Sequence, residues 1–272
     1  MQPRIANYKP ETDVVPHSKV DLDMKEINDL VGAASFTEAL FVYENGGGGK
    51  CSADDIANAA TGDSCLSKTT DDAKGNSVKG SGAIRTLFGF AACGSTCEAK
   101  LGAEKWYNVY KNYWNDAKYA DTYVRAAFAG TGFYVGKSNN MRAEVAKKGV
   151  AYQTVWMYVL HEFEDAIFDC LSGNIYDNEA SNIGGDSPHA WDEGWAFYAG
   201  SLEGVDGSGS GAMVHTLAEK RCADFGTCAD GRTGAATANV KHLANARQGR
   251  NKILAGDCFS LRWHEQYFRP PK

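Results

Sequence analysis

The chain has 272 residues, of which 43% are hydrophobic and 23% charged, a composition typical of globular proteins and not of disordered ones. Its 34 acidic and 28 basic residues leave a net charge of -6 without any long basic run, which excludes a nucleic-acid binder and favours a cation as the charged partner. No stretch approaches the roughly 18 consecutive apolar residues of a transmembrane segment.

Apolar residues recur at helical spacing along most of the chain, and no run alternates as a β-strand would, so the sequence predicts an all-α helical bundle. Residues 1–20 contain three prolines and are expected to form an extended arm. Helices are predicted near 24–31 and 36–45, and the second ends at four consecutive glycines that would lose too much backbone entropy in a helix. The polar, glycine-rich segment 51–82 is interpreted as an insertion pinned by a disulfide.

Beyond this insertion, helical spacing continues to the C-terminal prolines. The longest predicted helix runs from about Met141 to Leu171, with Asn139-Asn140 as its start signal and Ser172-Gly173 as its stop signal. The helices predicted in this part of the chain lie near 83–92, 98–118, 119–129, 141–171, 189–203, 212–223, 233–254 and 257–268.

Eight cysteines without the repeated spacing of a zinc site indicate disulfides and therefore an oxidising compartment. A Met1-Gln2 start with no apolar segment behind it indicates a mature secreted, periplasmic or cell-surface form whose targeting peptide has been removed. Buried free thiols in a cytosolic protein are the alternative. Short loop closures favour four pairs, namely Cys51 with Cys65, Cys93 with Cys97, Cys222 with Cys228, and Cys170 with Cys258.

Two segments resemble each other. The sequences from Phe36 to Tyr43 and from Trp191 to Tyr198 align without gaps and keep an aromatic residue, a glutamate and a tyrosine in step. We therefore expect the all-α domain 21–272 to contain an internal duplication, with units near 21–135 and 139–272. Chance likeness of two short amphipathic helices is the alternative.

Candidate metal ligands lie on three of the predicted helices. His161 and Glu164 are three residues apart in the longest helix and share with Phe168 a mixed face that is apolar enough to be buried, whereas Glu162 and Asp165 are expected on a wetter side. A hydrogen-bonded His/Glu pair at a helix surface is the simpler interpretation of His161 and Glu164 taken alone.

The duplicated segments add two carboxylates. Glu38 and Glu193 are both predicted on apolar or small-residue faces, and a carboxylate removed from water needs a cation, a donor or a proton. His189, four residues before Glu193, is a candidate further ligand on the same face; the alternative is a solvent-exposed side chain, because Pro188 places it at the start of the helix. Asp192 is interpreted as a first-turn residue that complements the helix dipole. Three carboxylates and one imidazole favour iron, as Fe3+ or Fe2+, ahead of manganese and zinc.

Three sequences, FTEALFVYENG at 36–46, HEFED at 161–165 and WDEGWAFYAG at 191–200, resemble the low-iron-inducible periplasmic, or Fe-assimilating, proteins of green algae. The resemblance extends over most of the chain. It implies a periplasmic or extracellular protein that assists iron uptake, with iron as its ligand and a membrane iron transporter or reductase system as its partner. The family is also distantly similar to imelysin-like helical proteins, whose His-x-x-Glu motif would fall on His161 and Glu164.

Two other functions fit the sequence. A metal-dependent hydrolase of imelysin-like type would need a general base, and the two spare carboxylates near His161 are expected to face away from it. A structural surface protein with buried acid networks and no metal is the third hypothesis. The sequence favours a protein that is not an enzyme.

Overall fold

The computed structural model forms two compact units, one made of Met1–Val14 with Val159–Lys272 and the other of Val15–Tyr158. We call them the discontinuous unit and the continuous unit. The predicted internal duplication stays a prediction. The residues that the structure describes are 3–49, 51, 53, 56, 69–71, 77–79, 86–92, 101–175, 187–207, 211–229 and 236–261.

The predicted all-α class is confirmed, with one small addition. Within the segment interpreted as an insertion, β1 (Thr69–Asp71) and β2 (Ser77–Lys79) form an antiparallel pair in which Thr70 lies opposite Val78. None of the described helices is both long enough and apolar enough to span a membrane.

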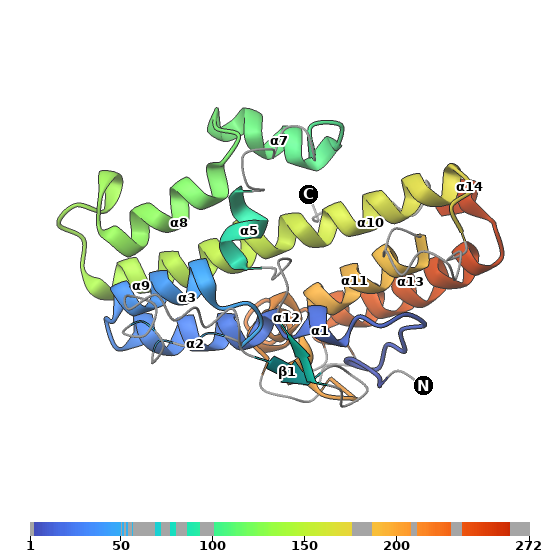
Figure 1. Ribbon diagram of the computed structural model, residues 1–272, viewed down its shortest axis with the longest axis horizontal. Coiled ribbons are helices and arrows are strands. Elements are labelled where there is room, and N and C mark those ends of the chain that lie inside the picture. Colours follow the sequence, from blue (N-terminus) through green and yellow to red (C-terminus); the bar gives the residue numbers. More distant parts are fainter. Residues whose placement is uncertain are drawn as a thin grey trace. The chain divides into compact units, whose positions relative to one another are not determined.

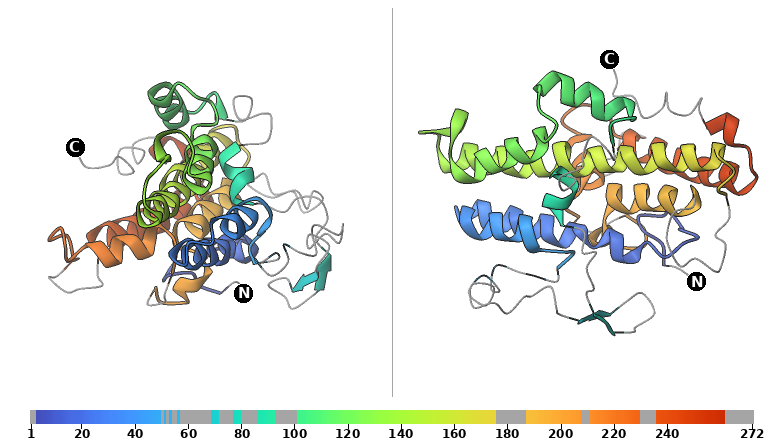
Figure 2. Two further views of the ribbon diagram at one scale, coloured as in Figure 1. Left: turned by 90° about the vertical axis from the view of Figure 1, so that its left-hand side faces the viewer. Right: turned by 45° about the horizontal axis from the view of Figure 1, so that its top comes forward.

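The continuous unit is a group of packed helices in which α2 lies beside α3 (Figures 1 and 2) and α8 lies beside α9. The region predicted as an extended arm already becomes helical at Val15, so the non-helical arm is confined to residues before it. The elements of this unit, in addition to the strands, are α1 (Val15–Ser18), α2 (Val20–Gly32), α3 (Phe36–Asn45), α5 (Leu87–Ala92), α7 (Lys105–Trp114), α8 (Tyr119–Ala129), η3 (Gly132–Tyr134), α9 (Asn139–Gly149) and η4 (Val150–Val155).

The discontinuous unit is built around α11, which packs against α12 and α13 (Figure 1). Trp191 and Trp195 on α11 are among the largest fully buried side chains of the described chain. The helices of this unit are most of α10 (Trp156–Leu171), then α11 (Ser187–Ala199), η5 (Ser201–Glu203), α12 (Val214–Arg221), α13 (Thr237–Leu254) and α14 (Cys258–Leu261).

The longest predicted helix is present, but it is not a regular α-helix throughout. It begins after Ser138, whose hydroxyl accepts a hydrogen bond from the Met141 N–H at 3.3 Å, and it ends at Leu171. Its middle, η4, is π-helical, which the sequence analysis missed. The π-helical segment follows Gly149 and contains three β-branched residues, which lose rotamers in a regular α-helix. Such segments are rare.

Two of the four predicted disulfides are confirmed. Cys170–Cys258 joins α10 to α14, and Cys222–Cys228 closes a short loop after α12. Cys51 is also disulfide-bonded, but its predicted partner and both members of the predicted 93–97 pair lie outside the described residues.

The glycine-rich end of α3 is held by a buried carboxylate. Asp23 on α2 accepts hydrogen bonds from the N–H groups of Gly48 and Gly49 at 2.8 and 2.7 Å. A side chain at Gly46 would reach the Asp23 carboxyl group, with a Cβ only 2.5 Å from its Cγ. Glycine is therefore needed at position 46 for the close approach of Asp23 as well as for ending the helix. Burial raises the pKa of Asp23 to about 7.

This raised pKa makes the stability of the protein depend on pH. Between about pH 4 and pH 7 folded Asp23 retains a proton that the unfolded chain releases, so its contribution to the free energy of unfolding is lost as pH rises through about 7. We expect urea midpoints measured from pH 4.5 to 7.5 to fall less steeply in Asp23→Asn than in the wild type. Asp29→Asn, at an exposed position on the same helix, should follow the wild-type curve, and parallel curves for Asp23→Asn would contradict the prediction.

Candidate metal centre

One candidate metal centre is a cluster of three residues on α10. His161, Glu162 and Asp165 each offer one ligand atom, and these atoms all lie within 4.8 Å of one another. His161 and Asp165 are one helical turn apart, which places them on the same face, and Glu162 follows His161 directly. An imidazole and two carboxylates form a donor set that suits iron, manganese or zinc.

The cluster corrects the predicted faces of α10. Glu162 was expected on a wet side but is only 5% exposed, whereas Phe168 was expected to be buried and is 67% exposed. Every residue from Met157 to Phe163 is buried. This half of the helix therefore has no solvent-exposed face, and positions around the helix axis do not distinguish buried from exposed side chains there. The sequence argument that Glu162 and Asp165 face away from His161, which counted against a hydrolase, is therefore wrong.

Glu164 and Glu38 are the other carboxylates predicted near His161, and neither belongs to this cluster. Glu164 is half-buried on α10 and does not belong to the cluster of His161, Glu162 and Asp165. Glu38 is half-buried on α3 in the continuous unit. Their role as ligands stays a prediction.

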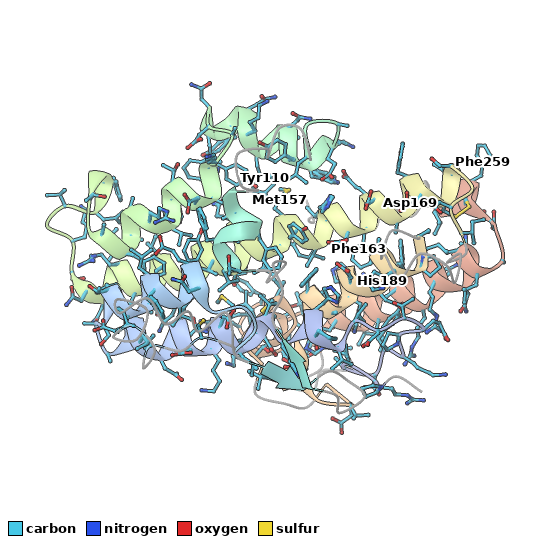
Figure 3. The ribbon with its side chains drawn as sticks, in the orientation of Figure 1. Tyr110, Met157, Phe163, Asp169, His189 and Phe259 are labelled. Carbon is cyan, nitrogen blue, oxygen red and sulfur yellow. A yellow bond between two sulfur atoms is a disulfide. The ribbon has the colours of Figure 1, made fainter. Side chains whose placement is uncertain are left out.

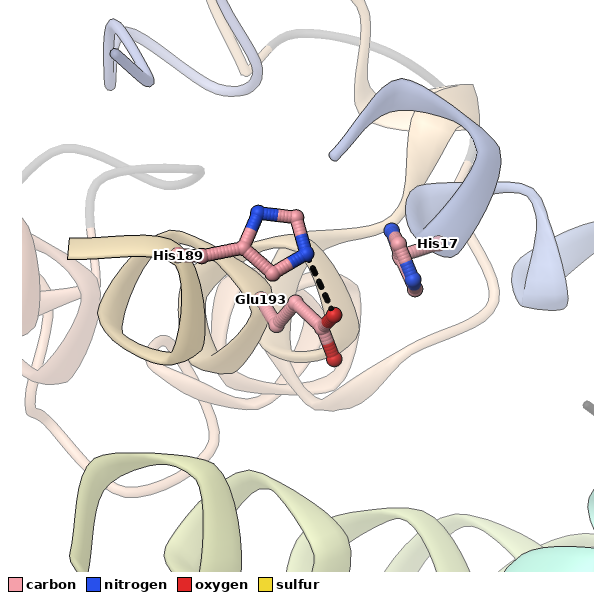
Figure 4. Close-up of side chains that lie close together, drawn as sticks. All are labelled: His17, His189 and Glu193. Atoms are coloured by element: carbon pink, nitrogen blue, oxygen red, sulfur yellow. Dashed lines mark ion pairs between the residues drawn. The ribbon is translucent and has the colours of Figure 1, made fainter. Parts of the chain in front are cut away.

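Glu193 lies on a helix that is buried around its whole circumference. Its side chain is 4% exposed, as its apolar face predicted, and its Oε1 lies 2.9 Å from Nε2 of His189, whose side chain is 19% exposed (Figure 4). His17, also drawn there, belongs to the continuous unit. The spacing of four residues thus places His189 and Glu193 in contact on one face of α11, as the sequence predicted.

The helix α11 packs closely on α10 at this point. The rings of Phe163 and Trp191 meet edge to face with centroids 4.8 Å apart, and a Cβ at Gly194 would come within 2.9 Å of the Phe163 ring. Figure 3 labels Phe163 on α10 and His189 on α11. Gly194 is thus the position that allows the two helices carrying the candidate ligands to approach each other.

Asp192 has a different function from the predicted complement to the helix dipole. It is completely buried, and its two oxygens accept hydrogen bonds from the N-terminal arm. The Tyr8 hydroxyl donates at 2.6 Å, the Glu11 N–H at 2.8 Å, and both the N–H and the hydroxyl of Thr12 at 2.9 Å. Because the arm occupies both oxygens, we assign Asp192 to holding the arm and not to binding metal.

A second buried acid and imidazole pair was missed by the sequence analysis. Oε2 of Glu203 lies 3.4 Å from Nδ1 of His215, and the Thr216 hydroxyl donates to Oε1 of the same carboxylate. Burial and the nearby His215 lower the pKa of His242 to about 4. No helical spacing relates Glu203 to His215, because they belong to different elements, η5 and α12.

A comparison with models of known protein families finds one match. The sequence model of a family described as low iron-inducible periplasmic protein matches residues 2–255. The chain belongs to this family. The match covers nearly the whole chain and confirms both the resemblance based on the three motifs and the periplasmic location.

The family description connects this low iron-inducible periplasmic protein to iron supply and names no enzymatic activity. No curated protein matches the chain, and no solved structure matches it. The candidate ligands of the metal centre therefore rest on the geometry of α10 and α11.

Proposed function

We propose that this low iron-inducible periplasmic protein binds iron directly during iron assimilation, with His161 as the central ligand. The observation that carries the proposal is the cluster of His161, Glu162 and Asp165, whose ligand atoms lie within 4.8 Å of one another in a chain of this family. One nitrogen and two hard oxygen donors suit ferrous or ferric iron, ahead of manganese and zinc.

Further ligands would come from α10 and α11. Glu164 is one turn from His161 along the same helix, and Glu193 with His189 offers a carboxylate and an imidazole on the buried helix α11. A carboxylate as buried as Glu193 is stabilised by a positive charge, which His189 supplies when protonated and a metal ion would supply more strongly. We propose Glu193 as a ligand and His189 as its partner or as a second nitrogen donor. Glu38 remains the predicted ligand on α3.

A protein that assists assimilation must also release its iron. Carboxylates and imidazoles bind metal only when they are deprotonated, so protons compete with the ion and acidification weakens the complex. The net charge of -6 raises the concentration of cations near the protein, an effect that salt screens. The receiving partner in this proposal is a membrane iron transporter or reductase system.

The proposal predicts that iron binding depends on His161 and Glu193. Each substitution to alanine removes one proposed ligand, so we expect His161→Ala and Glu193→Ala to weaken iron binding by about tenfold or more. Titration calorimetry with Fe2+ under nitrogen and with ferric citrate in air measures the affinity and the number of ions for each oxidation state. Circular dichroism establishes that the variants are folded.

A matched control is His215→Ala, which also breaks a buried pair between an imidazole and a carboxylate but lies outside the proposed centre. It should bind iron as the wild type does. Unchanged affinity in both His161→Ala and Glu193→Ala would remove these residues from the site.

The second candidate function is a structural protein of the periplasm without a metal. It is favoured by the buried acids that already have protein partners, since His189 contacts Glu193, His215 contacts Glu203, and the arm saturates Asp192. Elemental analysis of protein purified without a chelator separates the two functions. Iron in stoichiometric amount supports the metal centre, and absence of binding to both Fe2+ and ferric citrate supports the structural protein.

A further inference from the structure

An open cavity of about 570 Å³ lies within the continuous unit, among the end of α7, α8, η3 and α9. It is separate in sequence from every candidate ligand on α10 and α11. Its size falls within the range of small-molecule sites, which is about 300–1,000 Å³. Its lining is mostly apolar, and the side chains used below are Trp114, Tyr119, Tyr123, Ala126, Phe133 and Tyr134.

Aromatic rings form the walls of this cavity, and neighbouring rings stand at steep angles to one another. The rings of Trp114 and Tyr123 have centroids 5.5 Å apart and planes inclined by 60°, and those of Tyr123 and Tyr134 are 6.1 Å apart at 89°. Phe133, at the rim, is 72% exposed. Rings held edge to face present both faces and edges to an occupant, which is the geometry in which a further aromatic ring packs well.

One polar group of the lining has no hydrogen-bond partner among the described residues. Tyr119 is only 4% exposed, and its hydroxyl makes no hydrogen bond within the part of the chain that the structure describes. A buried hydroxyl is costly without a partner, and burial raises the pKa of Tyr119, so it remains a neutral donor. The cavity thus has apolar aromatic walls, and one of its lining residues, Tyr119, carries a covered hydroxyl without a hydrogen-bond partner among the described residues.

Asp116, the acidic residue of the lining, already has hydrogen-bond partners and does not need a cation. The two carboxylate oxygens of Asp116 accept hydrogen bonds from the Lys118 N–H at 2.8 Å and the Thr122 hydroxyl at 2.7 Å. These bonds hold the turn that begins α8, so the carboxylate already serves the fold. An uncharged occupant therefore fits the lining better than a cationic one.

We propose that this cavity binds a small, planar, uncharged aromatic molecule that carries a hydrogen-bond acceptor, and that on binding the covered Tyr119 hydroxyl becomes exposed and donates to this acceptor. The rings of Trp114, Tyr123 and Tyr134 supply the packing surface. The acceptor sets the orientation of the molecule, because the remaining lining offers mainly apolar contact. The site is independent of the proposed iron centre.

The test uses a pair of probes of nearly equal shape, 2-acetylnaphthalene, which has a carbonyl acceptor, and 2-ethylnaphthalene, which has none. Titration of the full chain, followed by NMR, should show both probes binding, with the acetyl compound about fivefold to tenfold tighter because of one hydrogen bond. Tyr119→Phe removes only the hydroxyl and should abolish this preference while the ethyl compound still binds. The buried hydroxyl is unpaired without ligand, so the variant should fold as the wild type does.

A second variant blocks the cavity. Ala126→Trp places an indole in it and should eliminate binding of both probes in protein that circular dichroism shows to be folded. Phe168→Ala removes an exposed aromatic ring on α10 and should leave both affinities unchanged. The proposal is overturned if neither probe binds the wild type, if Tyr119→Phe retains the preference, or if folded Ala126→Trp still binds the probes.

Discussion

Gly249→Ala is expected to destabilise the protein by about 2–4 kcal/mol, although alanine is normally the better helix former. Gly249 on α13 faces the Trp191 ring of α11, and a Cβ there would lie 2.5 Å from Cη2 of the indole. Trp191 is buried, and its Nε1–H donates to the Ala246 carbonyl at 2.8 Å. Displacing the ring therefore costs packing and a buried hydrogen bond together. The urea midpoint followed by tryptophan fluorescence measures the loss.

Gly32→Ala is the matched control, because Gly32 is also a helical glycine but the nearest atom to its added Cβ is a lysine Nζ at 4.0 Å. It should be neutral or should stabilise the protein by up to about 1 kcal/mol. In Trp191→Phe, a smaller ring should relieve the overlap, so Gly249→Ala should cost less in that background. Fully additive costs of the two substitutions would contradict the proposed contact.

Asp192→Ala is expected to release the N-terminal arm from the rest of the discontinuous unit and to cost about 3–5 kcal/mol. The substitution leaves four donors of the arm without their acceptor, among them the buried Tyr8 hydroxyl. Hydrogen exchange should become much faster in residues 3–14, and limited proteolysis should cut there first. Arg250, which donates to the Lys9 carbonyl, and Trp195, which donates to the Ile5 carbonyl at 2.9 Å, would still hold parts of the arm.

Asp224→Ala provides the comparison, since it breaks a carboxylate contact of similar length, 2.9 Å to Arg221, at a position where both side chains are exposed. Its cost should stay below about 1 kcal/mol. Arm protection that is equal in Asp192→Ala and in the wild type would show that the other contacts are sufficient.

Local signals were enough to predict several helices. The bounds of α3 and α8 agree with the sequence prediction at both ends. Each helix is followed by glycine, a signal that lies within one turn of its C-terminal boundary. Gly130 takes the left-handed conformation that ends α8, with φ of 67°. The burial of Glu193 and its contact with His189 also follow from spacing along one helix.

Features that depend on distant parts of the chain were not predictable from spacing. The partners of Asp192 come from a segment some 180 residues away, and no periodicity connects them. The burial of Glu162 was missed because a helix enclosed on all sides has no solvent face to serve as a reference. Glu203 and His215 belong to different elements, η5 and α12, so no spacing along one helix predicts their contact.

The hydrogen bond between Tyr8 and Asp192 spans 184 positions of the sequence, which has a consequence for biosynthesis. Tyr8 leaves the ribosome long before Asp192 exists, whereas the continuous unit is complete once Tyr158 has been made. That unit is able to begin folding during translation, whereas the N-terminal arm has no partner until the segment that carries Asp192 has been made. The docking of the first residues should therefore be a late step of folding, because contacts at such sequence separation close late.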